Sequence, residues 1–156
     1  MNKYYAVVAC VLIALTSFGC KDKSRPADLP EDMSPCLVTI TQEGVPLAGA
    51  TVEFKYSENV KYTTSGMTND SGVAEMKTYG YAGAQQGTAK VRVSKLVTEG
   101  ASEAEEYGEK GSLGNDFNVV DPKYMSYDTT DLEITITKEK CEQSFDVGAA
   151  VHNSAR

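Results

Sequence analysis

Tryptophan and histidine are the two residues that this chain most lacks. Its 156 residues include no tryptophan and one histidine, His152, close to the C-terminus. A histidine-based hydrolase needs such a side chain beside a nucleophile, and the G-x-S-x-G turn that presents a serine nucleophile in many hydrolases is missing as well. We therefore expect no catalytic residues and no enzyme activity.

Positive charge and long apolar runs are also scarce. The chain has 15 lysines and arginines against 22 aspartates and glutamates, a formal net charge of −7. Such a chain is not drawn electrostatically to nucleic acid or to an anionic membrane surface, so no nucleic-acid partner is expected. The longest apolar run, residues 4–18, is too short to span about 30 Å of hydrocarbon. Its length suits the hydrophobic region of a signal peptide.

The apolar run ends in the letters LTSFGC, residues 15–20, and charged residues follow at once. A plain secretory signal would be cleaved after the small-x-small pattern of residues 17–19. A lipoprotein signal would be cleaved at the same bond, and Cys20 would then carry a thioether-linked diacylglycerol. Ser17 departs from the aliphatic residue usual three places before that cysteine. We predict a signal peptide over 1–19 and lipidation of Cys20; a secreted chain or an uncleaved anchor is the alternative.

Two of the four cysteines remain once Cys10 leaves with the signal peptide and Cys20 takes the lipid. Cys36 and Cys141 are an even pair in an exported chain, which favours a disulfide. The bridge would close a loop of about a hundred residues and contribute roughly 4–5 kcal/mol in the chain-entropy account. The alternative is a pair of buried free thiols.

The segment between the lipid and the first strand, residues 20–35, holds three prolines, mixed charge and little apolar content. We expect a flexible, lipid-anchored tether with a reach of roughly 20 Å.

From residue 36 to 147 apolar and polar residues alternate, which is the period of β-strands. The turns EGVPLAG and NDSG separate the alternating runs. This pattern predicts one all-β domain, an Ig-like antiparallel β-sandwich of about seven strands. We expect a long acidic loop at 96–130 and a disordered tail at 148–156. The positions expected to face the core are Cys36, Val38, Ile40, Ala50, Val52, Phe54, Tyr56, Ala74, Met76, Ala89, Val91, Val93, Leu132, Ile134 and Ile136.

Four segments in this order resemble carboxypeptidase regulatory-like domains, which are transthyretin-like seven-stranded sandwiches. They are VTITQEGVPLAGATVEF (38–54), GMTNDSGVAEMKTYG (66–80), GTAKVRVSK (87–95) and DPKYMSYDTTDLEITITKEKCEQSFDV (121–147). The cysteine pair and the long acidic insert depart from the usual pattern. The resemblance implies a fold and an extracytoplasmic address, and it implies no particular activity.

Two kinds of binding site are open. Asn69 and Asp70, or the glutamates of residues 99–109, offer oxygens, but Ca²⁺ takes six to eight oxygen ligands and NDSG is typical of a hairpin turn. We therefore expect no metal and no cofactor. Tyr79 and Tyr81 stand in a YGYAG stretch and form a possible binding surface, because tyrosine is favoured at interfaces. A rigid turn packed on the sandwich is the alternative.

These features together predict a non-catalytic, lipid-anchored β-sandwich that acts as a structural or protein-interaction module of the cell envelope. It would lie on the outer side of a bacterial inner membrane or in the outer membrane. Its partners would be the membrane, through the N-terminal lipid, and an envelope protein or glycan. The alternative is a small-ligand or carbohydrate-binding lipoprotein that serves an envelope transporter or enzyme. We expect any binding face at a loop end that carries Tyr79, Tyr81 and residues 99–114.

Overall fold

The computed structural model describes residues 26–30, 33–57, 61–99 and 115–154. These residues form fifteen short strands and one 3-10 helix, which confirms the predicted all-β class. The signal peptide and Cys20 lie outside the described residues, as do residues 100–114.

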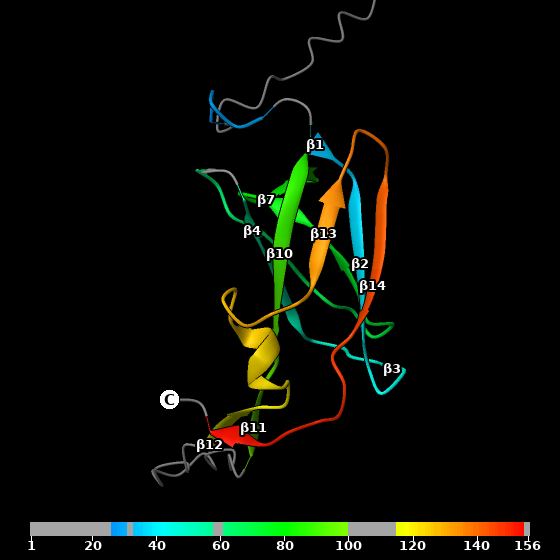
Figure 1. Cartoon of the computed structure of the whole chain (residues 1–156), viewed down its shortest axis with the longest axis vertical. Helices are drawn as coiled ribbons and strands as arrows, with labels where there is room; N and C mark the ends of the chain where they lie inside the picture. Colours follow the sequence, from blue (N-terminus) through cyan, green and yellow to red (C-terminus); the bar gives the residue numbers. More distant parts are fainter. Residues whose placement is uncertain (1–25, 31–32, 58–60, 100–114, 155–156) are drawn as a thin grey trace, which may run out of the picture.

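Two sheets pack face to face in the body of the molecule (Figure 1). The wide sheet has the order β13-β10-β4-β5-β7-β8, with β13 Glu133–Ile136, β10 Gly87–Ser94, β4 Thr51–Tyr56, β5 Thr64–Met67, β7 Lys77–Thr78 and β8 Tyr81–Ala82. The narrow sheet has the order β14-β2-β3, and β6 also pairs with β2; its strands are β14 Cys141–Asp146, β2 Cys36–Gln42, β3 Val45–Pro46 and β6 Val73–Glu75.

The core lies between these sheets and follows the predicted alternation. Val38 and Ile40 of β2 and Val91 of β10 are fully buried, while Lys90 and Arg92 face outward. Side chains of this kind contribute about 1.5–3 kcal/mol each when they leave water. Of the positions expected to face the core, only Leu132 is half-buried rather than buried. The period-two pattern therefore determines which face of each strand meets the other sheet.

One strand pair differs from the antiparallel sandwich that the sequence predicts. β14 runs parallel to β2, and the register places Cys141 opposite Cys36 and Phe145 opposite Ile40. The short turn after β13 carries the chain from the wide sheet to the narrow one. β14 reverses direction relative to β13 but lands beside a strand with which it shares no hairpin, so nothing forces that pairing to be antiparallel.

A third, small sheet extends one end of the sandwich. It has the order β11-β12-β15, with β11 Leu96–Glu99, β12 Asn115–Asn118 and β15 Asn153–Ser154. The 3-10 helix η1, Pro122–Met125, follows β12 and is capped by the Asp121 carboxylate. The expected loop at 96–130 therefore contains two strands and a helical turn. The expected disordered tail contains β15, whose backbone pairs with β12.

The opposite end holds the start of the described chain. β1, Met33–Ser34, pairs with β9, Ala84–Gln85, and the Ser34 hydroxyl donates to the carbonyl of Thr137 at 2.5 Å. Leu29 is only 2% exposed. The predicted flexible tether thus differs from the structure in its second half, where residues 26–30 and 33–35 belong to the folded domain.

Candidate functional site

The sandwich has two ends, which we call the tether end and the far end. The tether end consists of residues 26–30, the β7–β8 hairpin and the turn at 137–140. The far end consists of β11, β12 and β15 together with the turns at 43–44 and 69–72. Figure 1 shows the first group at the top and the small sheet at the bottom. The predicted binding residues Tyr79 and Tyr81 therefore lie at the tether end.

The strands that flank residues 100–114, β11 and β12, lie at the far end. We expected one loop end to carry both the tyrosines and this insert. The strands that flank the insert lie at the opposite end from Tyr79 and Tyr81, and residues 100–114 themselves lie outside the described residues. β10 runs from the level of Tyr56 to the level of Thr51, and β11 continues away from the hairpin. Tyr79 and Tyr81 are therefore separated from the strands β11 and β12 by the length of the sandwich.

Tyr79 occupies a strained position at the tip of the β7–β8 hairpin. Tyr79 and Gly80 both have positive φ, 51° and 83°, between the paired residues Thr78 and Tyr81. Two consecutive positive φ values define a type I′ turn, where asparagine and glycine are preferred. A side chain like tyrosine costs roughly 1–2 kcal/mol in that conformation. The ring is nevertheless 60% exposed, so core burial does not offset the strain.

Tyr79 belongs to a cluster that holds the incoming chain, which we call the tether latch: Asp28, Lys61, Tyr62 and Tyr79. The rings of Tyr62 and Tyr79 lie 4.9 Å apart at 48°. The Tyr62 hydroxyl donates to Asp28 Oδ1 at 2.6 Å, and Lys61 Nζ donates to Asp28 Oδ2 at 2.5 Å. These two hydrogen bonds, that of Lys61 first, lower the pKa of Asp28 to about 2. The latch joins residue 28 to a loop more than thirty residues away.

Cys36 and Cys141 begin β2 and β14 and are register partners at the tether end. Both are free thiols in the structure, so the predicted disulfide is not formed there. The structure does place the two cysteines next to each other, as the prediction requires. Burial first, then the hydrogen bond and charge of Cys141, raises the pKa of the Cys36 thiol. A thiol in this state is a poor nucleophile.

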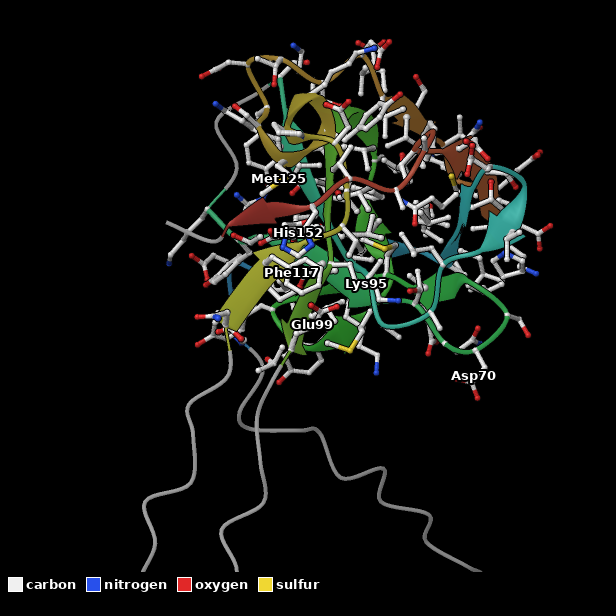
Figure 2. All side chains as sticks on the ribbon, turned by 90° about the horizontal axis from the view of Figure 1, so that it is seen from below. Asp70, Lys95, Glu99, Phe117, Met125 and His152 are labelled. Carbon is white, nitrogen blue, oxygen red and sulfur yellow. The ribbon has the colours of Figure 1, made fainter. Side chains whose placement is uncertain are left out.

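The far end is organised by an aromatic stack that the sequence did not predict. The ring of His152 lies on the ring of Phe117, 3.9 Å between centroids and 15° between planes. Figure 2 shows this stack with Lys95 and Glu99 close by. Phe117 is 6% exposed, and the Val151 amide donates to the Val119 carbonyl at 3.1 Å. The single histidine, one residue before β15, therefore stacks on the small sheet instead of lying in a frayed tail.

A buried amide fixes the junction between the body and the small sheet. Asn118 is 3% exposed, and its Oδ1 accepts from the amides of Val120 at 3.0 Å and Lys95 at 3.3 Å. Lys95 is the one residue between β10 and β11. The Asn118 side chain therefore accepts a backbone hydrogen bond at the point where the strand ladder is interrupted. Asparagine placed between a phenylalanine and two valines is the only sequence signal for this role.

Asn69 and Asp70, the candidate metal ligands, form part of a hairpin turn. Asn69 Oδ1 accepts from the amides of Ser71 at 2.9 Å and Val73 at 3.1 Å, as expected for NDSG. Asp70 stands at the tip of this turn, apart from the other labelled side chains (Figure 2). Within the described residues, no three histidine, cysteine or acidic side chains gather as a metal site. Four of the predicted alternative glutamate ligands lie in residues 100–114, outside the described residues.

The outer face of the wide sheet carries a polar cluster built on Arg92, Glu53, Lys55 and Tyr127. Arg92 forms an ion pair with Glu53, its cross-strand partner, and the Tyr127 ring lies 5.1 Å from the guanidinium. Lys55 lies 5.5 Å from the same ring centroid. Burial, then the Glu53 carboxylate, raises the pKa of Tyr127. The alternation of β4 and β10 could have predicted the Arg92–Glu53 pair, but not the tyrosine that covers it.

No protein-family profile matches this chain, and no curated protein or solved structure matches it significantly. The resemblance to carboxypeptidase regulatory-like domains therefore stays a prediction. Among the residues that the structure describes, no helix is long and apolar enough to cross a membrane.

Proposed function

We propose that this chain is a non-catalytic, lipid-anchored β-sandwich of the cell envelope that acts as a structural or protein-interaction module and binds its partner at the far end. One observation carries the proposal: the described chain begins at one end of the sandwich, and the small sheet projects from the other (Figure 1). A lipid on Cys20 would place the tether end at the membrane. The far end would then point away from it.

The reach of the anchor supports this orientation. Six residue steps separate Cys20 from Pro26, where the described chain begins. Six residues span at most about 22 Å when fully extended. The tether end would stay close to the bilayer, and partners would reach the far end first.

The surface of the far end suits a protein partner. Three of the four large apolar side chains that are strongly exposed in the described residues lie toward it, namely Val45, Met67 and Leu96 at 63–68% exposure. Single exposed apolar residues are ordinary on protein surfaces, but interface cores draw on such side chains. The carboxylates around them are Glu43, Asp70, Glu99, Asp116, Asp121 and Asp146. A partner with a complementary basic rim would associate faster at low ionic strength.

Two measurements test the proposal. The intact mass of the protein from its native membrane fraction should correspond to a chain that begins at Cys20 and carries a diacylglycerol. A photo-crosslinking residue at Leu96 should then capture a specific envelope protein on cells, while the same residue at Lys138, on the tether end, should not capture it. An unlipidated chain, or equal capture at both positions, contradicts the proposal. A melting shift with an envelope glycan and no crosslink would favour the ligand-binding alternative.

We also propose that Cys36 and Cys141 form a disulfide once the chain is exported. The support is their register: the two residues face each other in neighbouring strands, and their side chains are within hydrogen-bond reach. The two thiols would lose two electrons and two protons to an external disulfide, which would become two thiols. Alkylation of the unfolded native protein should label neither cysteine before reduction and both after it. Labelling without reduction would contradict the bridge.

A further inference from the structure

We propose that the Tyr62–Tyr79 pair, together with Lys61, is a membrane-contact surface that holds the tether end against the headgroup and glycerol region of the bilayer. This inference rests on the lipid anchor of the proposed function and adds which surface of the domain meets the lipid. Four observations support it: the strain at Tyr79, the position of the latch on the chain, the chemistry of the two rings, and the distribution of charge between the ends.

The strain at Tyr79 indicates that its ring has a role other than stabilising the fold. The residue holds φ at 51° at the tip of a type I′ turn, where asparagine would relieve the strain. Strained residues that are not buried gather at binding sites, where the environment they present is useful. A methyl group added at Gly80 would meet no atom outside its chain neighbours within 4 Å, so the tip of the turn is open beside Gly80. The tip can therefore approach a flat surface.

The latch places these rings next to the anchored chain. Asp28, which accepts from both Lys61 and Tyr62, lies eight residue steps after Cys20. Eight residues span at most about 29 Å, and less unless they are fully extended. The Tyr62 hydroxyl is 2.6 Å from the Asp28 carboxylate, and Tyr79 lies on the Tyr62 ring. A lipid on Cys20 would thus keep both rings within a few nanometres of the bilayer.

The chemistry of the cluster matches the membrane interface. Tyrosine is enriched where hydrocarbon meets the headgroups, because its ring is apolar and its hydroxyl is polar. Lys61 Nζ lies 5.1 Å from the Tyr62 ring centroid and is exposed. An ammonium beside the rings can contact a lipid phosphate while the rings lie at the level of the glycerol.

The charge of the two ends favours the same orientation. Among the described residues at and next to the tether end, four lysines stand against four carboxylates: Lys61, Lys77, Lys138 and Lys140, and Asp28, Glu75, Glu139 and Glu142. Among the described residues of the far end, carboxylates outnumber lysines. The negative potential of an anionic leaflet would therefore repel the far end and leave the tether end almost unaffected.

The absence of tryptophan allows a direct test with the full lipidated chain. In Tyr79→Trp the new indole is the only one in the protein. The chain is reconstituted into phosphatidylcholine vesicles whose acyl chains are brominated near the glycerol, since bromine quenches indole fluorescence at contact. We expect emission to fall at least about twofold for Tyr79→Trp, because the indole would lie at the interface. The matched control Val45→Trp, at a far-end position that is 65% exposed, should keep its emission.

Two further substitutions separate loss of membrane contact from loss of folding. Tyr81→Trp reports from the other side of the same turn, and Tyr79→Asn removes the ring while keeping a residue that tolerates positive φ. In the Tyr79→Asn background, quenching of Tyr81→Trp should fall to the level of the Val45→Trp control. Unchanged circular dichroism and melting temperature would show that the domain still folds.

The outcomes distinguish this inference from the proposed function. A chain that floats with the vesicles but leaves Tyr79→Trp unquenched overturns the membrane-contact surface and leaves the anchor intact. A chain without lipid that does not float overturns both. If Tyr79→Trp responds to a soluble envelope oligosaccharide and not to vesicles, the surface binds glycan, and the membrane-contact surface is again overturned.

Discussion

The tether end and the far end of this sandwich are stabilised by different kinds of contact. At the tether end, surface side chains hold the incoming chain: Asp28 accepts from Lys61 and Tyr62, and the strained Tyr79 packs against the Tyr62 ring. At the far end, backbone pairing between β12 and β15 is reinforced by the stack of His152 on the buried Phe117.

This difference indicates which end keeps its structure when salt and pH change and which end does not. Exposed ion pairs contribute little, about 0–1 kcal/mol, and salt and pH change them. Burial of an aromatic ring contributes more and is largely indifferent to both. We therefore expect the tether end to depend on solution conditions and the far end to remain ordered across them.

The two ends have turn glycines that should respond very differently to alanine. Gly72 at the far end has φ 73°, and a Cβ there would lie 2.6 Å from the Ile40 carbonyl oxygen, whereas a Cβ at Gly80 meets nothing within 4 Å. Gly72→Ala should cost about 3 kcal/mol or more, because backbone strain and a clash with backbone add. Gly80→Ala should cost only the strain, about 1 kcal/mol. Urea denaturation of both variants measures the contrast, and equal costs would contradict it.

Loss of the aromatic stack should loosen the far end locally. Phe117→Ala removes a buried ring and should destabilise the small sheet by about 3 kcal/mol. His152→Ala removes only the stacked partner and should cost about 1 kcal/mol. Hydrogen exchange should quicken at the Val151 amide in both variants, more in the first, and stay unchanged at Val91 in the core. Faster exchange at Val91 would mean that the small sheet does not open independently.

Acid should release the tether end before it affects the core. The folded pKa of Asp28 is about 2, below its usual value of 3.8, so its protonation is disfavoured in the latch. The latch therefore contributes fully above about pH 4 and is lost as the pH falls through about 2. The protection of the amides in residues 26–30 against hydrogen exchange, relative to an unstructured chain at the same pH, should fall over that interval. Asp28→Asn should show the same loss of protection at neutral pH. Protection that stays constant over this pH interval in the wild type would exclude the latch.

The smallest effect is expected for the stability of Tyr79→Asn. The variant relieves a positive φ that costs tyrosine roughly 1–2 kcal/mol, and it loses a ring contact of about 0.5–1.5 kcal/mol. The two nearly cancel, so the melting temperature should move by less than about 5 °C. A loss much larger than this would show that Tyr79 is a structural residue of the hairpin.

The sequence predicted the body of the sandwich because that body depends on local alternation. The pattern around Val38, Ile40, Val52 and Val91 is strict, since one face of each strand meets the core and the other meets water. The NDSG turn was predictable for the same reason: Asn69 bonds its own neighbours, so no distant residue is needed.

The ends were not predictable because their contacts join segments far apart in the chain. β15 has two residues, and nothing in the local sequence says that Asn153 will pair with Asn118. The Asp28 latch requires two exposed side chains more than thirty residues away, and exposed polar residues carry no periodic signal. The parallel pairing of β14 with β2 likewise depends on which sheet receives the strand after a short turn.

The parallel pair has a mechanical consequence. β2 begins at the tether end, and β14 leaves toward the far end. If the lipid and a partner pull in opposite directions, the two strands are drawn lengthwise past each other, and their hydrogen bonds must yield together. An antiparallel hairpin loaded from one end would open one bond at a time. Single-molecule stretching between residues 26 and 154 should therefore give one abrupt rupture, and a gradual opening would contradict this. A domain anchored at one end and engaged at the other would bear load along its stiffest direction.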